Sequence, residues 1–241
     1  MKLGLVSAIL PEYTFEEMVS LIHKLDMNCI EPACWPVGRA ERRYAGVTHI
    51  DVRDIPDNAH RYLDALEAND VTISGLAYYP NPLDPDLTAR ESALEHLKKL
   101  IKSARALNTS IVNTFIGKMP KATPDENWKE FLAVWPDIIR LAEDCGVTVC
   151  IENCPMFFSM DEWPGGKNLA SNPSFWNAMF EAIPSKRFAL NYDPSHLVLQ
   201  QMDYIAPIYA FAEKIKHVHI KDMKFYREKY DQYGFLATPQ L

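Results

Sequence analysis

The sequence predicts an α/β fold, namely a (β/α)8 TIM barrel whose eighth strand is missing from the given chain. Short apolar runs alternate with longer amphipathic segments, which is the pattern of repeated βαβ units. Seven strand-like runs follow one another without a linker, more than a doubly wound sheet usually contains. The turn after the first run, SAILPEYTF, has no glycine, whereas a nucleotide-binding sheet has a glycine-rich first turn.

The predicted strands are spaced by roughly 30 residues. In chain order they cover residues 3–9, 28–34, 71–79, 110–117, 147–154, 188–193 and 216–222. After the last run only a polar, aromatic-rich segment follows, up to Leu241. We therefore predict one domain over residues 1–241, with its C-terminal part incomplete.

Helix start and stop signals lie between these runs. A hydroxyl residue followed three positions later by Glu forms a capping box, Pro favours the first helical position, and Gly ends helices. The signals are Thr14 with Glu17, Thr88 with Glu91, Thr123-Pro124 with Glu126, Asn172-Pro173, and Gly146.

Composition narrows the classes of function. The net charge is −7 and the pI is near 5.5, which argues against nucleic acid as the main partner. Five cysteines without a CxxC pair indicate free thiols in a reducing compartment. The N-terminal segment MKLGLVSAIL fits a first strand better than it fits a signal peptide. No apolar run is long enough to span a membrane. We expect a cytoplasmic protein, and barrels of this kind often form homo-oligomers.

Three consecutive strands carry polar residues on the face that points to the barrel axis. Side chains alternate between the two faces of a strand, so Cys150 and Glu152 point inward while Val149 and Ile151 point outward. The same alternation turns Asp193 inward. In the last run, the same alternation predicts that His217, His219 and Lys221 point inward. Because active sites of TIM barrels lie at the carboxyl ends of the strands, we expect these side chains to meet there.

Glu152, Asp193 and His219 are the predicted metal ligands. Two carboxylates and one imidazole suit one divalent ion, Mn²⁺ first, with Mg²⁺, Co²⁺ or Zn²⁺ as alternatives. Each residue also has a simpler interpretation: Asp193 before Pro can be a turn residue, and His219 a hydrogen-bonded core residue. Glu152 is the hardest to explain without an ion, because Glu is almost never fully buried unpaired.

Three motifs, VCIENCP, NYDPSHL and HVHIKD, make the chain resemble the xylose isomerase-like TIM-barrel superfamily, in particular its sugar phosphate isomerase/epimerase family. The resemblance implies one metal on Glu152, Asp193 and His219, plus a glutamate from the eighth strand, expected beyond Leu241. It also implies that Glu152 serves as an acid/base and that His196 binds a substrate oxygen. AP endonuclease relatives need histidines that the third and fourth strands lack, which disfavours a three-metal nuclease.

The function we predict is a divalent-metal-dependent isomerase or epimerase of a free sugar or keto-sugar. The ion would bind adjacent hydroxyl and carbonyl oxygens, acidify the C–H beside the carbonyl and stabilise a metal-bound enediolate. Glu152 would move the proton. Lys221 would neutralise oxyanion charge, although a salt bridge with Asp222 or another barrel acid is an equal alternative.

Further substrate contacts are predicted at Asn153, Trp35 and Tyr78. Asn153 lies beside Glu152 and either contacts substrate or holds a loop, and Trp35 and Tyr78 lie at the ends of the second and third strands. For the two aromatic residues, core packing is at least as good an explanation. The segment 157–171 contains Gly165-Gly166 and is either a lid over the site or a static loop.

Two alternatives remain open at the level of sequence. The first is a lyase on the same scaffold, such as an inosose dehydratase or an enzyme that eliminates a group β to a keto carbon. The second is a non-catalytic barrel subunit, which the missing eighth strand favours.

Overall fold

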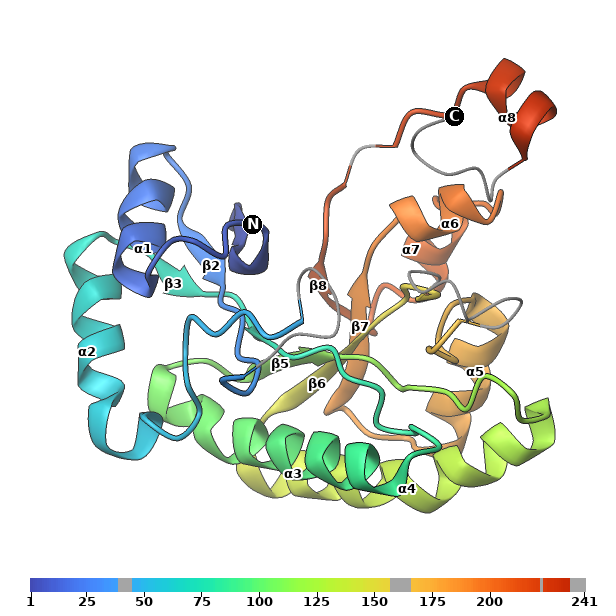
Figure 1. The fold of residues 1–241 in the computed structure, drawn as a ribbon, viewed down its shortest axis with the longest axis horizontal. Coiled ribbons are helices and arrows are strands. Elements are labelled where there is room, and N and C mark those ends of the chain that lie inside the picture. The colour runs from blue at the N-terminus through green and yellow to red at the C-terminus, as the bar shows by residue number, and fades with distance from the viewer. Residues whose placement is uncertain (39–44, 157–165, 222, 235–241) are drawn as a thin grey trace.

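The chain folds into two parallel sheets that form the staves of an open TIM barrel (Figure 1). The computed structural model describes residues 1–38, 45–156, 166–221 and 223–234. Each of the seven predicted runs contains a strand, and the order of the sheets follows the chain. One sheet contains β1 (Gly4–Val6), β2 (Cys29–Glu31) and β3 (Thr72–Ile73); the other contains β4 (Leu76–Ala77), β5 (Ile111–Thr114), β6 (Thr148–Glu152), β7 (Phe188–Tyr192) and β8 (Ile215–Val218).

The run predicted over residues 71–79 forms two strands instead of one. β3 pairs with β2, whereas β4 pairs with β5. Gly75 lies at the break, where a Cβ atom would come within 2.8 Å of Asn113 Nδ2. A side chain at this position would therefore clash with β5, and the chain passes from one sheet to the other here.

Five longer helices pack on the outside of the sheets: α1 (Phe15–Lys24), α2 (Ile55–Ala68), α3 (Leu87–Ser103), α4 (Pro124–Cys145) and α5 (Pro173–Ala182). α3 and α4 lie side by side along one side of the molecule (Figure 1). Shorter helical segments are η1 (Ser7–Ile9), η2 (Ala104–Leu107), α6 (Ser195–Leu199), α7 (Ala206–Ala210) and α8 (Arg227–Tyr233), and α8 stands apart from the sheets.

Most of the predicted helix boundaries are confirmed. Thr14 and Thr123 form complete capping boxes, Asn172 caps α5, and Gly146 ends α4 in the left-handed conformation with φ of 66°. The capping box predicted at Thr88 is wrong. α3 starts at Leu87, two residues earlier than that box implies, and Asp86 caps it by accepting hydrogen bonds from the N–H groups of Thr88 and Ala89.

The core lies between the second sheet and its helices. The outward faces of β6 and β7 pack on α4, where the ring of Trp135 stacks on Phe188 with centroids 5.9 Å apart. By contrast, Val218 of β8 and the following Ile220 are 46% and 72% exposed. The helical layer is thus complete over β6 and β7 and, among the described residues, thin over β8.

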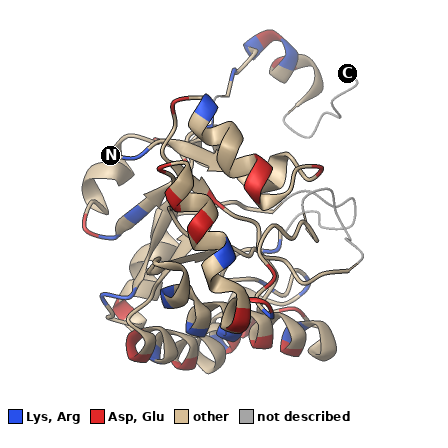
Figure 2. Ribbon diagram, turned by 90° about the vertical axis from the view of Figure 1, so that its left-hand side faces the viewer, with Lys and Arg blue, Asp and Glu red and all other residues tan. Residues whose placement is uncertain are grey.

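The barrel is open between β1 and β8. Within the residues that the structure describes, β1 pairs only with β2 and β8 only with β7. A cavity of about 1000 Å³ lies along this opening and reaches residues at the carboxyl ends of the strands. Acidic and basic residues are interspersed on the outer helices (Figure 2), and no helix in the described part of the chain is long and apolar enough to span a membrane.

Candidate metal centre

Three neighbouring strands bring Glu152, Asp193 and His219 together. Glu152 ends β6, Asp193 follows β7, and His219 follows β8. Each offers one donor atom, and these atoms lie within 4.8 Å of one another. The side chains are 6%, 0% and 9% exposed, so the polar groups that the sequence placed on one face converge in a buried cluster.

Local hydrogen bonds fix the position of Asp193. The side chain of Asn153 joins β6 to the end of β7 by donating to the carbonyl of Asp193 and accepting from its N–H, at 2.8 and 2.7 Å. At the start of α6, the N–H and hydroxyl of Ser195 donate to Asp193 Oδ1, at 2.9 and 2.6 Å. The other oxygen, Oδ2, is buried and lies 2.6 Å from the ammonium nitrogen of Lys221. It therefore already faces a cationic group.

Glu152 is surrounded by nitrogen atoms. Its Oε1 lies 3.2 Å from His196 Nε2, 3.4 Å from His219 Nδ1 and 3.9 Å from Lys221 Nζ. Burial alone would raise the pKa of this carboxyl, but the two imidazoles outweigh burial and lower the pKa well below its usual range. Glu152 is therefore ionised, as both a metal ligand and a proton acceptor must be.

Lys221 places its ammonium group on the same cluster. Its Nζ lies 2.6 Å from Asp193 Oδ2 and 3.1 Å from His196 Nε2. Burial lowers the pKa of Lys221, and the carboxylates of Glu152 and Asp193 more than reverse this and raise it. Lys221 thus forms an ion pair with a barrel acid, Asp193. Asp222, the other predicted partner, lies outside the described residues.

Glu31 is a member of the cluster that the sequence analysis missed. It ends β2, is 2% exposed, and its Oε2 lies 2.6 Å from His219 Nε2. The hydroxyl of Tyr79 donates to Glu31 Oε1 at 2.5 Å. A signal was present, because Cys29-Ile30-Glu31 repeats the tripeptide Cys150-Ile151-Glu152, and a glutamate in an apolar strand needs a partner there as well.

His219 lies between the two glutamates. Burial lowers the pKa of its imidazole, but the carboxylates of Glu31 and Glu152 outweigh burial and raise the pKa well above its usual value. Burial also raises the pKa of Glu31, and His219 and His217 outweigh it, so the pKa of Glu31 is lowered. The two carboxylates on either side of His219 thus favour its protonated form.

A second layer of polar groups supports this cluster. His217 Nδ1 lies 2.9 Å from Asn191 Oδ1, and its Nε2 lies 3.0 Å from Ser74 Oγ. Burial lowers the pKa of His217, and because an amide oxygen only accepts, its Nδ1 donates to Asn191. The amide nitrogen of Asn191 donates to the hydroxyl of Tyr79 at 3.1 Å.

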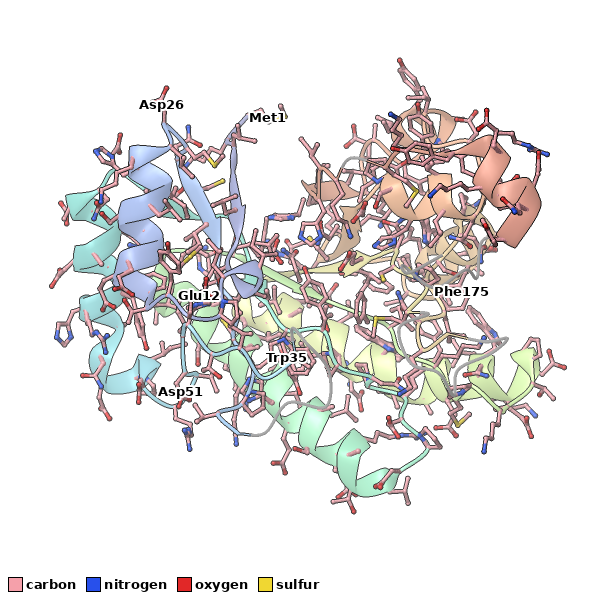
Figure 3. All side chains as sticks on the ribbon, turned by 45° about the horizontal axis from the view of Figure 1, so that its top comes forward. Met1, Glu12, Asp26, Trp35, Asp51 and Phe175 are labelled. Atoms are coloured by element: carbon pink, nitrogen blue, oxygen red, sulfur yellow. The ribbon has the colours of Figure 1, made fainter. Side chains whose placement is uncertain are left out.

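The predicted substrate contacts divide into two groups. His196 and Trp35 line the cavity, and Trp35 lies toward the middle of the molecule (Figure 3). Tyr78 is buried away from the cavity, edge-on to Trp35 and to His96 of α3, with centroids 4.9 and 4.5 Å apart. Its neighbour Tyr79 lines the cavity instead. Asn153 is fully buried and contacts the backbone of Asp193, and residues 157–165 of the predicted lid lie outside the described part of the chain.

The donors fit a hard or borderline divalent ion. Two carboxylates and one imidazole are ligands that Mn²⁺, Mg²⁺, Co²⁺ and Zn²⁺ accept, and the buried Asp193 Oδ2 already faces a positive charge, the Lys221 ammonium at 2.6 Å. Two further groups also have donor atoms within 4.8 Å of one another, namely Glu31 with His217 and His219, and Glu152 with Cys154 and His196. All three groups share a member with the cluster around His219 and Glu152, so they describe one centre.

Comparison with known proteins agrees with this architecture. Residues 19–232 match a family model described as xylose isomerase-like TIM barrel. The uncharacterized protein YfiH of Bacillus subtilis (strain 168) is 25% identical over 268 residues, which cover 100% of this chain and 79% of YfiH.

Solved structures share the fold. The probable 3-DHS dehydratase AsbF from Bacillus anthracis superposes with a TM-score of 0.72 at 18% identity, over 95% of this chain and 76% of AsbF. D-psicose 3-epimerase from Clostridium cellulolyticum H10 superposes with a TM-score of 0.69 at 15% identity, over 92% of this chain and 73% of the epimerase. At these identities the likeness shows the fold alone, and the predicted TIM barrel is confirmed.

Proposed function

The chain belongs to the xylose isomerase-like TIM-barrel family, and from that premise we propose that it is a divalent-metal-dependent isomerase or epimerase of a free sugar or keto-sugar. The observation that carries the proposal is the convergence of Glu152, Asp193 and His219, with one donor atom each within 4.8 Å. Buried charges are tolerated when they coordinate an ion. We propose these three as ligands and Mn²⁺ as the preferred ion, with Mg²⁺, Co²⁺ or Zn²⁺ as alternatives.

The bound ion would supply positive charge that polarises a carbonyl and makes the neighbouring C–H more acidic. Glu152 would take that proton, because its carboxylate is ionised and faces the cavity. His196 lies 3.2 Å from Glu152 Oε1 and would hold a hydroxyl of the substrate beside the reacting carbon. Lys221 would orient an oxygen that gains negative charge.

The cavity supports a small polar substrate with apolar faces. Its volume of about 1000 Å³ is ample for a monosaccharide, and both Trp35 and Tyr79 contribute to its wall. Aromatic rings of this kind pack on the C–H faces of sugars. D-psicose 3-epimerase and L-ribulose 3-epimerase, whose folds are similar, act on such molecules by their names. A cytoplasmic location is part of the proposal, and the free thiols of Cys29, Cys34, Cys145 and Cys150 support it.

The test is exchange of substrate C–H hydrogen with solvent deuterium, followed by NMR on a panel of ketoses with Mn²⁺ present. The wild-type protein should exchange one carbon-bound hydrogen beside the carbonyl. Glu152→Gln should lower the exchange rate about 10²- to 10⁴-fold, the usual contribution of a general base, while Mn²⁺ still binds weakly. Exchange at the wild-type rate in Glu152→Gln would rule out this role for Glu152.

A lyase is the second candidate, because the fold of a probable dehydratase, AsbF, is among the similar structures. Proton removal by Glu152 would be the same, and the departure of a group β to the carbonyl would follow. Product NMR separates the two reactions, since a dehydratase forms a product that lacks one water.

A non-catalytic barrel is the remaining possibility. It predicts that the purified full-length protein contains no stoichiometric divalent ion. Elemental analysis that finds about one ion per chain would instead support the proposed enzyme, because a centre with one set of ligands holds one ion.

A further inference from the structure

We propose that Glu31 is a positioning residue that holds the Nε2 proton of His219, so that Nδ1 is offered unprotonated to the cation at Glu152 and Asp193. This inference rests on the proposed metal centre and adds a residue that neither the predicted ligands nor the predicted substrate contacts include. Glu31 belongs to β2, across the barrel from the strands that carry the ligands.

The two ring nitrogens of His219 face different carboxylates. Nδ1 lies 3.4 Å from Glu152 Oε1, on the side of the three predicted ligands. Nε2 lies 2.6 Å from Glu31 Oε2. A neutral imidazole carries one proton, and the nitrogen that keeps it cannot bind an ion. The carboxylate of Glu31 therefore favours the form in which the proton stays on Nε2.

The other groups near Nε2 do not compete with Glu31 as acceptors. The amide nitrogen of Asn191 lies 3.1 Å from Nε2, but an amide N–H₂ only donates. The hydroxyl of Tyr79 lies at 3.5 Å and already donates to Glu31 Oε1. Among the described residues, Glu31 Oε2 is thus the one acceptor within 3 Å of Nε2.

Glu31 is itself held in place. Its Oε1 accepts from Tyr79, whose oxygen accepts from the amide of Asn191. Because Oε1 is engaged, Oε2 faces His219 in a fixed orientation. A carboxylate that accepts from the far nitrogen of a metal-binding histidine fixes the ring and raises its basicity. Glu31, Tyr79 and Asn191 form such a support from β2, the segment after β4, and β7.

The decisive variant is Glu31→Gln, which keeps the shape and the acceptor for Tyr79 but turns an N–H₂ group toward Nε2. Nε2 then accepts, and the proton of His219 moves to Nδ1, where it blocks the ion. We measure Mn²⁺ affinity from the free-ion signal in electron paramagnetic resonance. The affinity of Glu31→Gln should fall about 10- to 100-fold, the usual effect of losing such a partner.

The matched control is Glu143→Gln, the same substitution at a carboxylate that accepts from the hydroxyl of Ser185 and lies outside the cluster. Its Mn²⁺ affinity should match that of the wild-type protein. A second readout is the ¹⁵N NMR spectrum of the His219 ring in the Mg²⁺-loaded wild-type protein, in which Nε2 should carry the proton.

Failure of the inference is distinguishable from failure of the proposed function. If the wild-type protein binds Mn²⁺ and a folded Glu31→Gln binds it equally well, the role of Glu31 is wrong and the metal centre stands. If the wild-type protein binds no Mn²⁺, both are wrong. Should Glu31→Gln not fold, Glu31→Ala with added acetate replaces it, because Glu31 lines the cavity; affinity that acetate does not restore would also overturn the proposal.

Discussion

β2 and β6 end with the same three residues, but these residues have different surroundings. Cys29-Ile30-Glu31 and Cys150-Ile151-Glu152 each end in a buried glutamate that contacts His219. Glu152 has Asp193 as its neighbour on the next strand, whereas Glu31 has the hydroxyl of Tyr79. The same tripeptide thus supplies a candidate ligand at one position and a support at the other, and the neighbouring strand decides which.

The residue that follows each glutamate strengthens the difference. Asn153 follows Glu152 and makes two hydrogen bonds to the backbone of Asp193. Pro32 follows Glu31 and has neither an N–H nor a polar side chain. β6 is therefore tied to β7 at the level of the candidate ligands by a side chain, whereas the segment after β2 is tied to β4 by the backbone, where the N–H of Ala77 donates to the carbonyl of Pro32.

The largest expected effect is that of Asp193→Asn, which removes one candidate ligand beside β6. The amide oxygen still accepts from Ser195, so the fold is retained, but the negative charge facing the ion and Lys221 is lost. Removing one partner of a buried charge pair costs about 3–5 kcal/mol, and Mn²⁺ affinity measured by paramagnetic resonance should fall at least about 100-fold.

The matched control for that change is Asp203→Asn. Asp203 Oδ1 accepts from the N–H groups of Ile205 and Ala206, much as Asp193 Oδ1 accepts from Ser195, but Asp203 does not contact the centre. Its Mn²⁺ affinity should match that of the wild-type protein. Equal affinity in both variants would show that the β6 side is not the metal side.

A smaller effect is expected for Asn153→Ala, which breaks the tie between β6 and β7. Two buried hydrogen bonds are lost, and the free energy of unfolding should fall by about 2–4 kcal/mol, together with Mn²⁺ affinity. The control is Asn127→Ala, because Asn127 of α4 is also buried and makes two hydrogen bonds to the backbone of Met119. It should lose similar stability in urea unfolding and keep its Mn²⁺ affinity; a loss of affinity in both would mean that the tie has no specific role.

The smallest effect concerns pH in the metal-free protein. The raised pKa of His219 means that the folded state binds more protons than the unfolded state above the ordinary histidine value of about 6.5. Stability is therefore fully present below that pH and falls as pH rises through the folded pKa, by at most about 1.4 kcal/mol per pH unit for one proton.

Glu31 and Glu152 change the stability with pH in the opposite direction to His219. Their lowered pKa values stabilise the fold above the ordinary Glu value of about 4.3, and this contribution is lost as pH falls through the folded pKa values. Urea unfolding between pH 5 and 9 should show the decline on the alkaline side, and Glu31→Gln should flatten it more than Glu152→Gln, since Glu31 interacts more strongly with His219. An unchanged slope in Glu31→Gln would contradict the contact between them.

The strands, their order and the convergence of Glu152, Asp193 and His219 could be predicted because they follow from local patterns. Alternation within β6, β7 and β8 is regular, so counting by two from an apolar residue gives the correct face. The prediction failed where regularity ends. The break at Gly75 divides the third run into two strands. Tyr79 lines the cavity, and Tyr78 packs against Trp35 and His96, which is the core alternative that the sequence also allowed.

Other features depend on contacts that no single stretch of sequence contains. Glu31 contacts His219 although the two residues are 188 positions apart in the sequence. The three motifs that carry the family resemblance do not include Glu31. Asn153 was expected to contact substrate or a loop, and its two bonds to Asp193 become visible only when β6 and β7 lie side by side. Asp86 replaced Thr88 as a cap because a carboxylate one position before the helix reaches two N–H groups.

In the part of the chain that the structure describes, β1 and β8 each have an unpaired edge, and this affects how the purified chain behaves. Unpaired strand edges are templates for aggregation between copies, and the exposed Val218 and Ile220 add apolar surface at one of them. Lys2 and Lys216 both lie along the opening, where like charges oppose the approach of a second copy. Salt screens that repulsion, so concentrated samples of this chain should be clearest at low ionic strength.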